Sequence, residues 1–239
     1  MIPLASEKLF SIFGLRITDT VTGTLLTDAV LITVVMLVYA GMKAVPGKLQ
    51  NVFEIVLEYF YATTKDIAGE RAQSIFPWFA SFFLFIFTAN ILGLLPGYGL
   101  FTIKEGGEAI PFFRVPSSDL NTTLALAVIS VVATHALSIR YTGIKGYLGR
   151  FFSLSPILLF VGLLELVAEV TKLISFSFRL FGNIFAGEIV LGRVSSILSY
   201  VAPLPFLVLE IIVATVQALI FAALTMAFMS IFTEKHAEH

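Results

Sequence analysis

Residues 156–191 read PILLFVGLLELVAEVTKLISFSFRLFGNIFAGEIVL, an apolar run in which charged side chains recur. At a rise of about 1.5 Å per residue, a helix of this length is much longer than the roughly 30 Å hydrocarbon core of a bilayer. Such a helix must tilt strongly or lie partly within the bilayer. The run therefore predicts a long, strongly tilted membrane helix.

The composition of the whole chain is also that of a membrane protein. Of its 239 residues, 58% are hydrophobic and 13% are charged, and the net charge is −1. Soluble domains carry about 25% charged residues. We expect an all-α integral membrane protein that forms a single membrane domain over residues 1–239.

Several classes of function are excluded by the same composition. No basic surface is expected for a nucleic acid, and the absence of cysteine excludes disulfides and thiolate chemistry. The sequence has no nucleotide-binding glycine loop and no hydrolase motif, and it has only three histidines. We therefore expect no cofactor and no metal.

Five apolar runs predict about five membrane helices, of which the last two are long and strongly tilted. The runs lie at about residues 28–45, 75–95, 118–139, 156–191 and 201–232. Residues 47–71 carry apolar and charged side chains at helical spacing, which predicts an amphipathic helix at the membrane interface. The polar stretch before residue 28 has no signal-peptide pattern, so the first run is expected to be retained.

The Lys and Arg side chains outside the runs predict the orientation of the chain. Eight of them follow the first or third run or lie at the C-terminus, and five lie on the opposite side. We expect a multi-pass protein with its N-terminus outside and its C-terminus in the cytoplasm.

Polar side chains inside the last two runs carry most of the functional information, because a charge at the centre of a membrane helix costs at least about 2.5–3.5 kcal/mol. They are Glu165, Glu169, Lys172, Ser175, Arg179, Asn183, Glu188, Glu210 and Gln217. At 100° per residue, Glu165, Lys172 and Arg179 share one stripe of a helix, whereas Glu188 points to the opposite surface. This pattern suggests two paths that enter the membrane from opposite sides.

Some of these charges have a purely structural alternative. An ion pair of Lys172 with Glu165 or Glu169 explains that lysine as well as a functional role does. Arg179 differs, because residues 173–185 contain no acidic side chain and a guanidinium does not lose its proton in a protein. Its carboxylate partner must come from another helix or another chain.

Three polar residues of the earlier runs are less decisive. His135 is expected to lie at the interface rather than to relay protons, and Asn90 is expected to pack and to form hydrogen bonds. Asp119 precedes an apolar run, so it is expected to cap a helix or to line an outer aqueous entrance.

The segment SFSFRLFGNIFAGEIVLG, residues 175–192, resembles the signature of subunit a of F-type ATP synthases, the membrane stator beside a rotating ring of c subunits. Three further stretches resemble the same family in the same order. They are NILGLLPG at residues 90–97, PSSDLNTTLALA at residues 116–127 and LEIIVATVQALIFAALTMAF at residues 209–228.

The resemblance implies a site and a mechanism. Arg179 falls on the arginine that faces the ion-binding carboxylate of the c ring, and the other matched positions belong to two half-channels. Those of the outer path and the centre are Glu188, Glu210, Asn183, Gln217 and Asp119, and those of the inner path are Glu165, Lys172 and Ser175. Glu210 is a histidine in some members of the family, so here two glutamates would share a proton.

The resemblance also implies partners and a location. They are the c-subunit ring, the peripheral-stalk b subunits, the remainder of the complex and the lipid bilayer, in a bacterial plasma membrane. The chain would be a non-catalytic, proton-translocating subunit, with nucleotide chemistry on other subunits. The alternatives are a stand-alone proton-coupled secondary transporter, against which the absence of an internal repeat counts, and a structural scaffold.

Overall fold

The computed structural model describes residues 6–12, 15–43, 47–98, 101–105, 108–151, 156–197 and 203–234. Long helices dominate these residues. They are α1 (Asp19–Ala40), α2 (Lys48–Ala68), α3 (Ala72–Leu94), α4 (Leu120–Phe151), α5 (Pro156–Ile197) and α6 (Pro203–Thr233). Short 3-10 turns at Gly69–Arg71 and Pro116–Ser118 precede α3 and α4. The protein is an all-α integral membrane protein.

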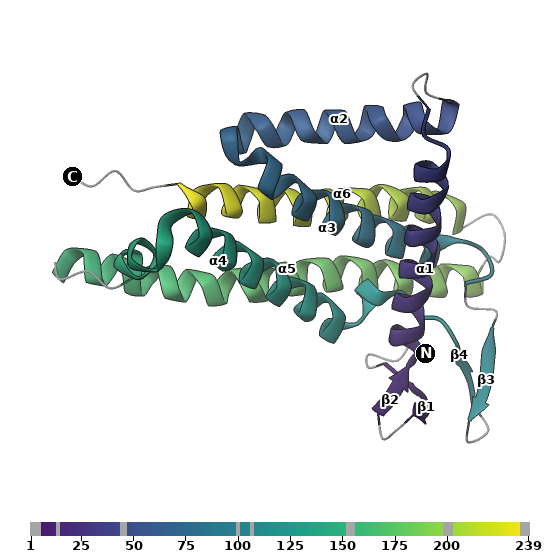
Figure 1. Ribbon diagram of the computed structural model, residues 1–239. Coiled ribbons are helices and arrows are strands. Elements are labelled where there is room, and N and C mark those ends of the chain that lie inside the picture. The colour runs from purple at the N-terminus through teal and green to yellow at the C-terminus, as the bar shows by residue number, and fades with distance from the viewer. Residues whose placement is uncertain are drawn as a thin grey trace.

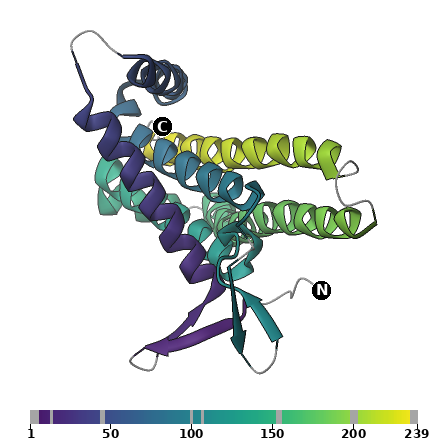
Figure 2. The same ribbon diagram turned by 90° about the vertical axis from the view of Figure 1, so that its right-hand side faces the viewer.

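The long helices run in two main directions (Figures 1 and 2). α3, α4, α5 and α6 lie side by side, and α1 runs steeply across them. α2 lies across one end of α1, and two β-hairpins project beyond the other end. If α1 crosses the membrane upright, α5 and α6 are therefore strongly tilted.

Among the described residues, four stretches of helix are long and apolar enough to cross a membrane. They are Asp19–Ala40, a part of Gln50–Leu94, Leu120–Phe151 and Pro203–Thr233. α5, with 42 residues, is longer than α1, α4 and α6, but it carries more charged side chains. It extends to Ile197, beyond the expected end at residue 191, and residues 201 and 202, where the last run was expected to begin, lie outside the described residues.

α1 begins at Asp19, nine residues before the start of the expected span at residue 28, and ends at Ala40. Threonine hydroxyls in its first turns donate hydrogen bonds to backbone carbonyls of the same helix. Thr24 donates to the carbonyl of Thr20 (2.8 Å), and Thr27 donates to that of Gly23 (2.9 Å). Gly23 lets the helix pack closely, because a Cβ there would overlap the carbonyl oxygen of Arg114. A polar sequence can therefore be helical here, since its polar groups bond within the protein.

α4 continues to Phe151, 12 residues beyond the end of the expected span at residue 139. The basic stretch after residue 139 is helical, with Arg140 and Lys145 exposed and Phe151 buried. Gly143 breaks the helix with φ 76° and ψ 162°. This left-handed conformation favours glycine, and it redirects the last turns of α4.

Two short hairpins were not expected from the sequence. β1 (Lys8–Ile12) pairs antiparallel with β2 (Leu15–Thr18), and β3 (Thr102–Glu105) pairs antiparallel with β4 (Glu108–Pro111). Both lie on the side of the molecule where α1 begins (Figure 1).

Aromatic and small residues form the core between the helices. Phe60 of α2 packs edge-on against Phe79 and Phe83 of α3, with ring centroids 5.1 and 4.8 Å apart. Ala218 and Ala222 of α6 are completely buried, which allows close approach of the neighbouring backbones. This packing holds α5 and α6 together and fixes the faces that carry the polar residues.

Candidate functional site

Arg179 lies on an exposed face of α5. Its guanidinium donates a hydrogen bond to Ser175 Oγ (3.2 Å), one helical turn earlier. Among the residues that the structure describes, no carboxylate lies within ion-pair distance of Arg179. The exposed neighbours Ile174 and Phe178 are apolar. A permanent positive charge therefore sits in an apolar face without a counter-charge in the described chain.

The opposite side of the same helical turns is fixed in the bundle. Phe176 and Leu180 are buried, and the Phe176 ring packs against Phe221 of α6 with centroids 5.3 Å apart. The hydroxyls of Ser177 and Thr123 of α4 lie 3.1 Å apart. Arg179 thus projects from a helix whose rotation is set by contacts on its other side.

α6 meets α5 beside the arginine. Gln217 and Arg179 line a cavity of about 10 Å³ together with Phe176, Leu180, Phe221 and Leu224. A space of this size is about that of one water molecule. Asn183, one turn beyond Arg179, is exposed on the same face. The structure therefore brings together the polar residues predicted at this level of the two helices.

A second cavity, of about 20 Å³, contains both glutamates of the predicted outer path. Its lining residues are Asn90, Gly93, Leu94, Val115, Ile184, Glu188, Glu210 and Ala214. Gly187 makes room for Glu210, because a Cβ at that position would overlap the Glu210 carboxylate. The two carboxylates, which the sequence could not connect, thus face one small space between α3, α5 and α6.

Asn90 is 2% exposed, and within the described chain neither atom of its side-chain amide has a hydrogen-bond partner. It is therefore buried, as the expected packing role requires, and its amide lines the cavity without a hydrogen bond to the described residues.

A buried arginine lies close to Glu188. Ser118 forms a hydrogen bond with the Glu188 side chain, and the charge of Arg114 acts on it. The Arg114 guanidinium, 6% exposed, donates to Oγ (3.3 Å) and to the backbone oxygen (3.2 Å) of Ser118. The Tyr98 hydroxyl donates to the Arg114 carbonyl (3.2 Å). Glu188 thus has a fixed polar neighbourhood built from the loop before α4.

Asp119 caps α4, as one of its two expected roles requires. One carboxylate oxygen accepts the backbone N–H of Asn121 (2.9 Å), and the other accepts the hydroxyl of Thr20 (3.0 Å). Asp19, the first residue of α1, is 1% exposed, and its Oδ2 has no partner among the described residues. The beginnings of α1 and α4 are therefore joined through buried carboxylates and threonine hydroxyls.

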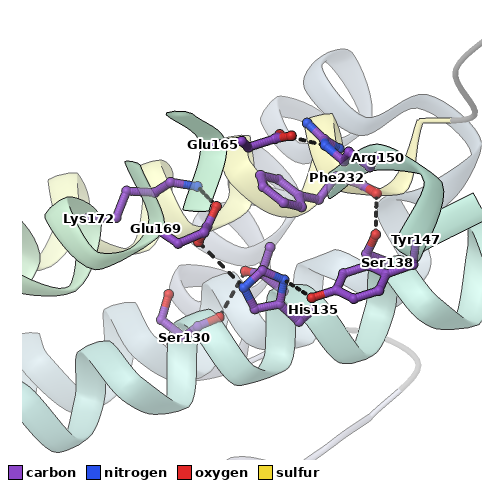
Figure 3. Close-up of polar contacts among 10 residues, drawn as sticks. Ser130, His135, Ser138, Tyr147, Arg150, Glu165, Glu169, Lys172 and Phe232 are labelled. Carbon is purple, nitrogen blue, oxygen red and sulfur yellow. Dashed lines mark hydrogen bonds and ion pairs between the residues drawn. The ribbon is translucent and has the colours of Figure 1, made fainter. Parts of the chain in front are cut away.

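The acidic residues near the start of α5 are ion-paired (Figure 3). Arg150 Nε lies 2.5 Å from Glu165 Oε1, and Lys172 pairs with Glu169 one turn before it. The Phe232 ring of α6 lies between the two cations, with Arg150 Cζ at 4.0 Å and Lys172 Nζ at 4.5 Å from its centroid. The geometry therefore supports the ion-pair explanation of Lys172.

His135 belongs to the same cluster. Its Nε2 lies 3.5 Å from Glu169 Oε2, and its Nδ1 lies 3.2 Å from the Tyr147 hydroxyl (Figure 3). The histidine is therefore held by two polar partners on opposite sides of its ring, which differs from the simple interfacial position expected from the sequence.

Sequence reasoning missed Asp19, Arg114 and Arg150 as members of these clusters. From the sequence, Arg114 and Arg150 enter only the count of basic side chains outside the apolar runs. Two signals were available: Arg114 precedes a proline and two serines that can hold it in place, and Arg150 follows Gly143 in a stretch with helical spacing of Tyr147 and Phe151. Their partners, however, come from other helices.

The whole arrangement separates two sets of ionisable side chains along α5. Nineteen residues separate Glu169 from Glu188, which is about 28 Å of helix, and Arg179 lies between them. Within the described parts of the chain, no group of three or more His, Asp or Glu side chains is arranged to hold a metal ion. The structure thus places two polar regions along α5, with the exposed Arg179 between them.

The sequence is similar to a family of known membrane subunits. The profile of the family described as ATP synthase A chain matches residues 21–230. ATP synthase subunit a of Moorella thermoacetica is 29% identical over 229 residues, covering 96% of this chain and 97% of that protein. The same subunit is 33% identical over 214 residues in Geotalea daltonii, covering 88% of this chain and 86% of that protein.

In Syntrophobacter fumaroxidans, ATP synthase subunit a is 34% identical over 214 residues, covering 88% of this chain and 82% of that protein. The family profile reaches from α1 to α6 and includes every polar residue of the site described above except Asp19 and Thr20. The chain therefore belongs to the ATP synthase subunit a family and is a non-catalytic, proton-translocating stator subunit in the membrane part of that complex.

Proposed function

We propose that this chain forms two offset half-channels against a rotating ring of c subunits, with Arg179 facing the ion-binding carboxylate of the ring. The observation that carries the proposal is the environment of Arg179. Its guanidinium is exposed in an apolar face of α5 and has no carboxylate partner within the described chain. A partner subunit with a carboxylate in an apolar surface would complete this site.

The outer path runs through the cavity that Glu188 and Glu210 share. Asp119 lies towards the outer entrance, and Asn183 and Gln217 lie near Arg179. A proton that enters from outside binds one of the two glutamates and passes to the ring carboxylate. The shared cavity supports this role, because two carboxylates in one small, poorly solvated space favour holding one proton between them.

The inner path begins on the other side of Arg179. Ser175 accepts the hydrogen bond of the guanidinium, and Glu165 and Lys172 lie towards the start of α5. A proton released by the ring leaves along these side chains. Glu165 is paired with Arg150, and Lys172 is paired with Glu169. These side chains therefore keep the path polar without adding net charge to it.

Arg179 separates the two paths. Because a guanidinium does not deprotonate in a protein, it cannot pass a proton from the outer to the inner side. It attracts the ring carboxylate only when that group has lost its proton, so ion flow requires rotation of the ring. The driving force includes about 2.3 kcal/mol per charge for each 100 mV of membrane potential.

The remaining features of the proposal concern the setting of the chain. The partners are the c ring, the b subunits of the peripheral stalk and the rest of the complex, and nucleotide chemistry takes place on other subunits. The membrane is the bacterial plasma membrane, with the N-terminus outside and the C-terminus in the cytoplasm. The excess of Lys and Arg on the proposed cytoplasmic side supports this orientation.

The test is ATP-driven acidification of inverted membrane vesicles that contain the complex with Arg179→Ala. The matched control is Arg193→Ala, which removes an exposed arginine from the same helix. Pumping is measured per assembled complex, together with passive proton leak. We expect the Arg179 variant to lose pumping or to leak, and the Arg193 variant to pump like the wild type. An assembled Arg179 variant that pumps normally without leak would contradict the proposal.

A further inference from the structure

The ring of His135 is held between an acid and a phenol. Glu169 Oε2 lies 3.5 Å from Nε2, and the Tyr147 hydroxyl lies 3.2 Å from Nδ1. Figure 3 shows the two partners on opposite sides of the ring. Both nitrogens are thus in position to exchange protons, one towards α5 and the other towards the last turns of α4.

This contact depends on the break in α4. Tyr147 follows His135 by 12 residues, which in a straight helix would separate them by about 18 Å. The left-handed conformation of Gly143 turns the end of the helix back. The same turn brings Arg150 to Glu165 on α5. The chain therefore uses an unusual backbone conformation to place a phenol on the histidine.

Glu169 does not need His135 as a counter-charge. One carboxylate oxygen of Glu169 is paired with Lys172, which leaves the other for the imidazole. The remaining charged groups of the cluster, Arg150 and Glu165, neutralise each other. From α6, among the described residues, the Phe232 ring packs on the histidine, with centroids 5.6 Å apart. With a neutral imidazole the cluster has no net charge.

Solvent access also differs between the two central residues. The side chain of His135 is 21% exposed, whereas that of Glu169 is 10% exposed. The histidine is therefore the group of this pair through which protons can be exchanged with water. Imidazole titrates near neutral pH and can hold a proton on either nitrogen, which suits it for this exchange.

We propose that His135 is a proton-exchanging residue of the inner path, with Tyr147 and Glu169 as its positioning residues. The inference rests on the proposed function. The neutral ring takes a proton on the nitrogen that carries none, and the Glu169 carboxylate stabilises the imidazolium. The ring then releases the proton of the other nitrogen to water, and a further exchange with water at its exposed edge restores the first tautomer. One proton enters and one leaves in each passage.

The test measures ATP-driven proton pumping by inverted vesicles, whose outer face is the proposed inner side. His135→Gln keeps a polar side chain but cannot carry a proton, and His135→Ala leaves space for a small base. We expect the pumping rate per assembled complex to fall by about tenfold or more in both variants. We expect added imidazole to restore pumping by the Ala variant, and pyrazole, which has similar size but is not basic at neutral pH, to have no effect.

Two controls separate proton exchange from structure. Ser138→Ala removes the hydrogen bond of that hydroxyl to the Phe232 carbonyl (2.7 Å) within the same cluster and should pump like the wild type. Tyr147→Phe keeps the ring of the positioning residue but removes its hydroxyl, so we expect the dependence of pumping on inner pH to change.

The outcomes distinguish this inference from the proposed function. A His135→Gln complex with the rate and pH profile of the wild type overturns the inference, as does a His135→Ala loss that imidazole does not restore. Failure of both His135 variants to assemble also overturns it, because it would assign the residue a structural role. If Arg179→Ala abolishes pumping in the same vesicles, the proposed function stands in each of these cases.

Discussion

Near the start of α5, Glu165 and Glu169 each form an ion pair with a basic side chain. Towards its other end, Glu188 shares a cavity with Glu210, and Glu210 has no hydrogen-bond or ion-pair partner among the described residues. The first region is neutral through pairing, and the second places two acids together. Similar residues in one helix therefore have different surroundings: Glu165 and Glu169 are neutralised by basic side chains of the bundle, whereas Glu188 lines a cavity with a second acid, beside Ser118 and Arg114.

The largest effect on stability is expected from breaking the paired region. Glu169→Gln leaves the mostly buried Lys172 without its counter-charge, and loss of one partner of such a pair costs about 3–5 kcal/mol. Denaturant titration of the purified protein in detergent micelles, followed by circular dichroism, measures the free energy of unfolding.

Two variants sharpen this comparison. The double substitution Glu169→Gln with Lys172→Met removes both charges and should recover most of the loss. Glu210→Gln should change the free energy of unfolding by less than about 1 kcal/mol, because no ion pair is broken. Equal losses for Glu169→Gln and Glu210→Gln would remove the distinction between the two regions.

The cavity that Glu188 and Glu210 share should be most sensitive to added side-chain volume. Gly187→Ala places a Cβ where the Glu210 carboxylate lies, and overpacking of this kind costs about 1–3 kcal/mol. The displaced carboxylate should also lower the rate of proton pumping in vesicles.

Gly182→Ala is the matched control, since a Cβ at that position meets no atom within 4 Å. It lies on the same helix and should leave the free energy of unfolding close to that of the wild type, so the two variants are compared by stability alone. If Gly187→Ala behaves like Gly182→Ala, Glu210 does not occupy the position described.

Among the three substitutions that disturb the packing, ion pairs or backbone, the smallest effect is expected at the break of α4. Gly143→Ala forces a residue with a Cβ into a left-handed conformation, at a cost of about 1–2 kcal/mol. Gly149→Ala, in the same segment with open space around its Cβ, should be neutral or slightly stabilising. Thermal unfolding of both variants tests this, and equal melting temperatures would count against the break.

The sequence predicted the fold class and the lack of a nearby acidic partner for Arg179 because both follow from local patterns. Apolar run length sets membrane helices, and the absence of acids near Arg179 is visible in the chain itself. It did not predict the start of α1 at Asp19, since threonine hydroxyls that bond within the helix make a polar stretch helical. Arg150 reaches Glu165, and Tyr147 reaches His135, only because the chain turns at Gly143. The spacing of apolar residues does not predict the backbone conformation of that glycine.

The break at Gly143 also constrains chain length in the segment that follows it. Each residue inserted between Gly143 and Tyr147 would rotate the rest of the segment by about 100° and move it by about 1.5 Å along its axis. The Tyr147 hydroxyl and the Arg150 guanidinium would then turn away from their partners together. Substitutions are therefore easier to accommodate in residues 144–146, which are exposed, than any insertion or deletion.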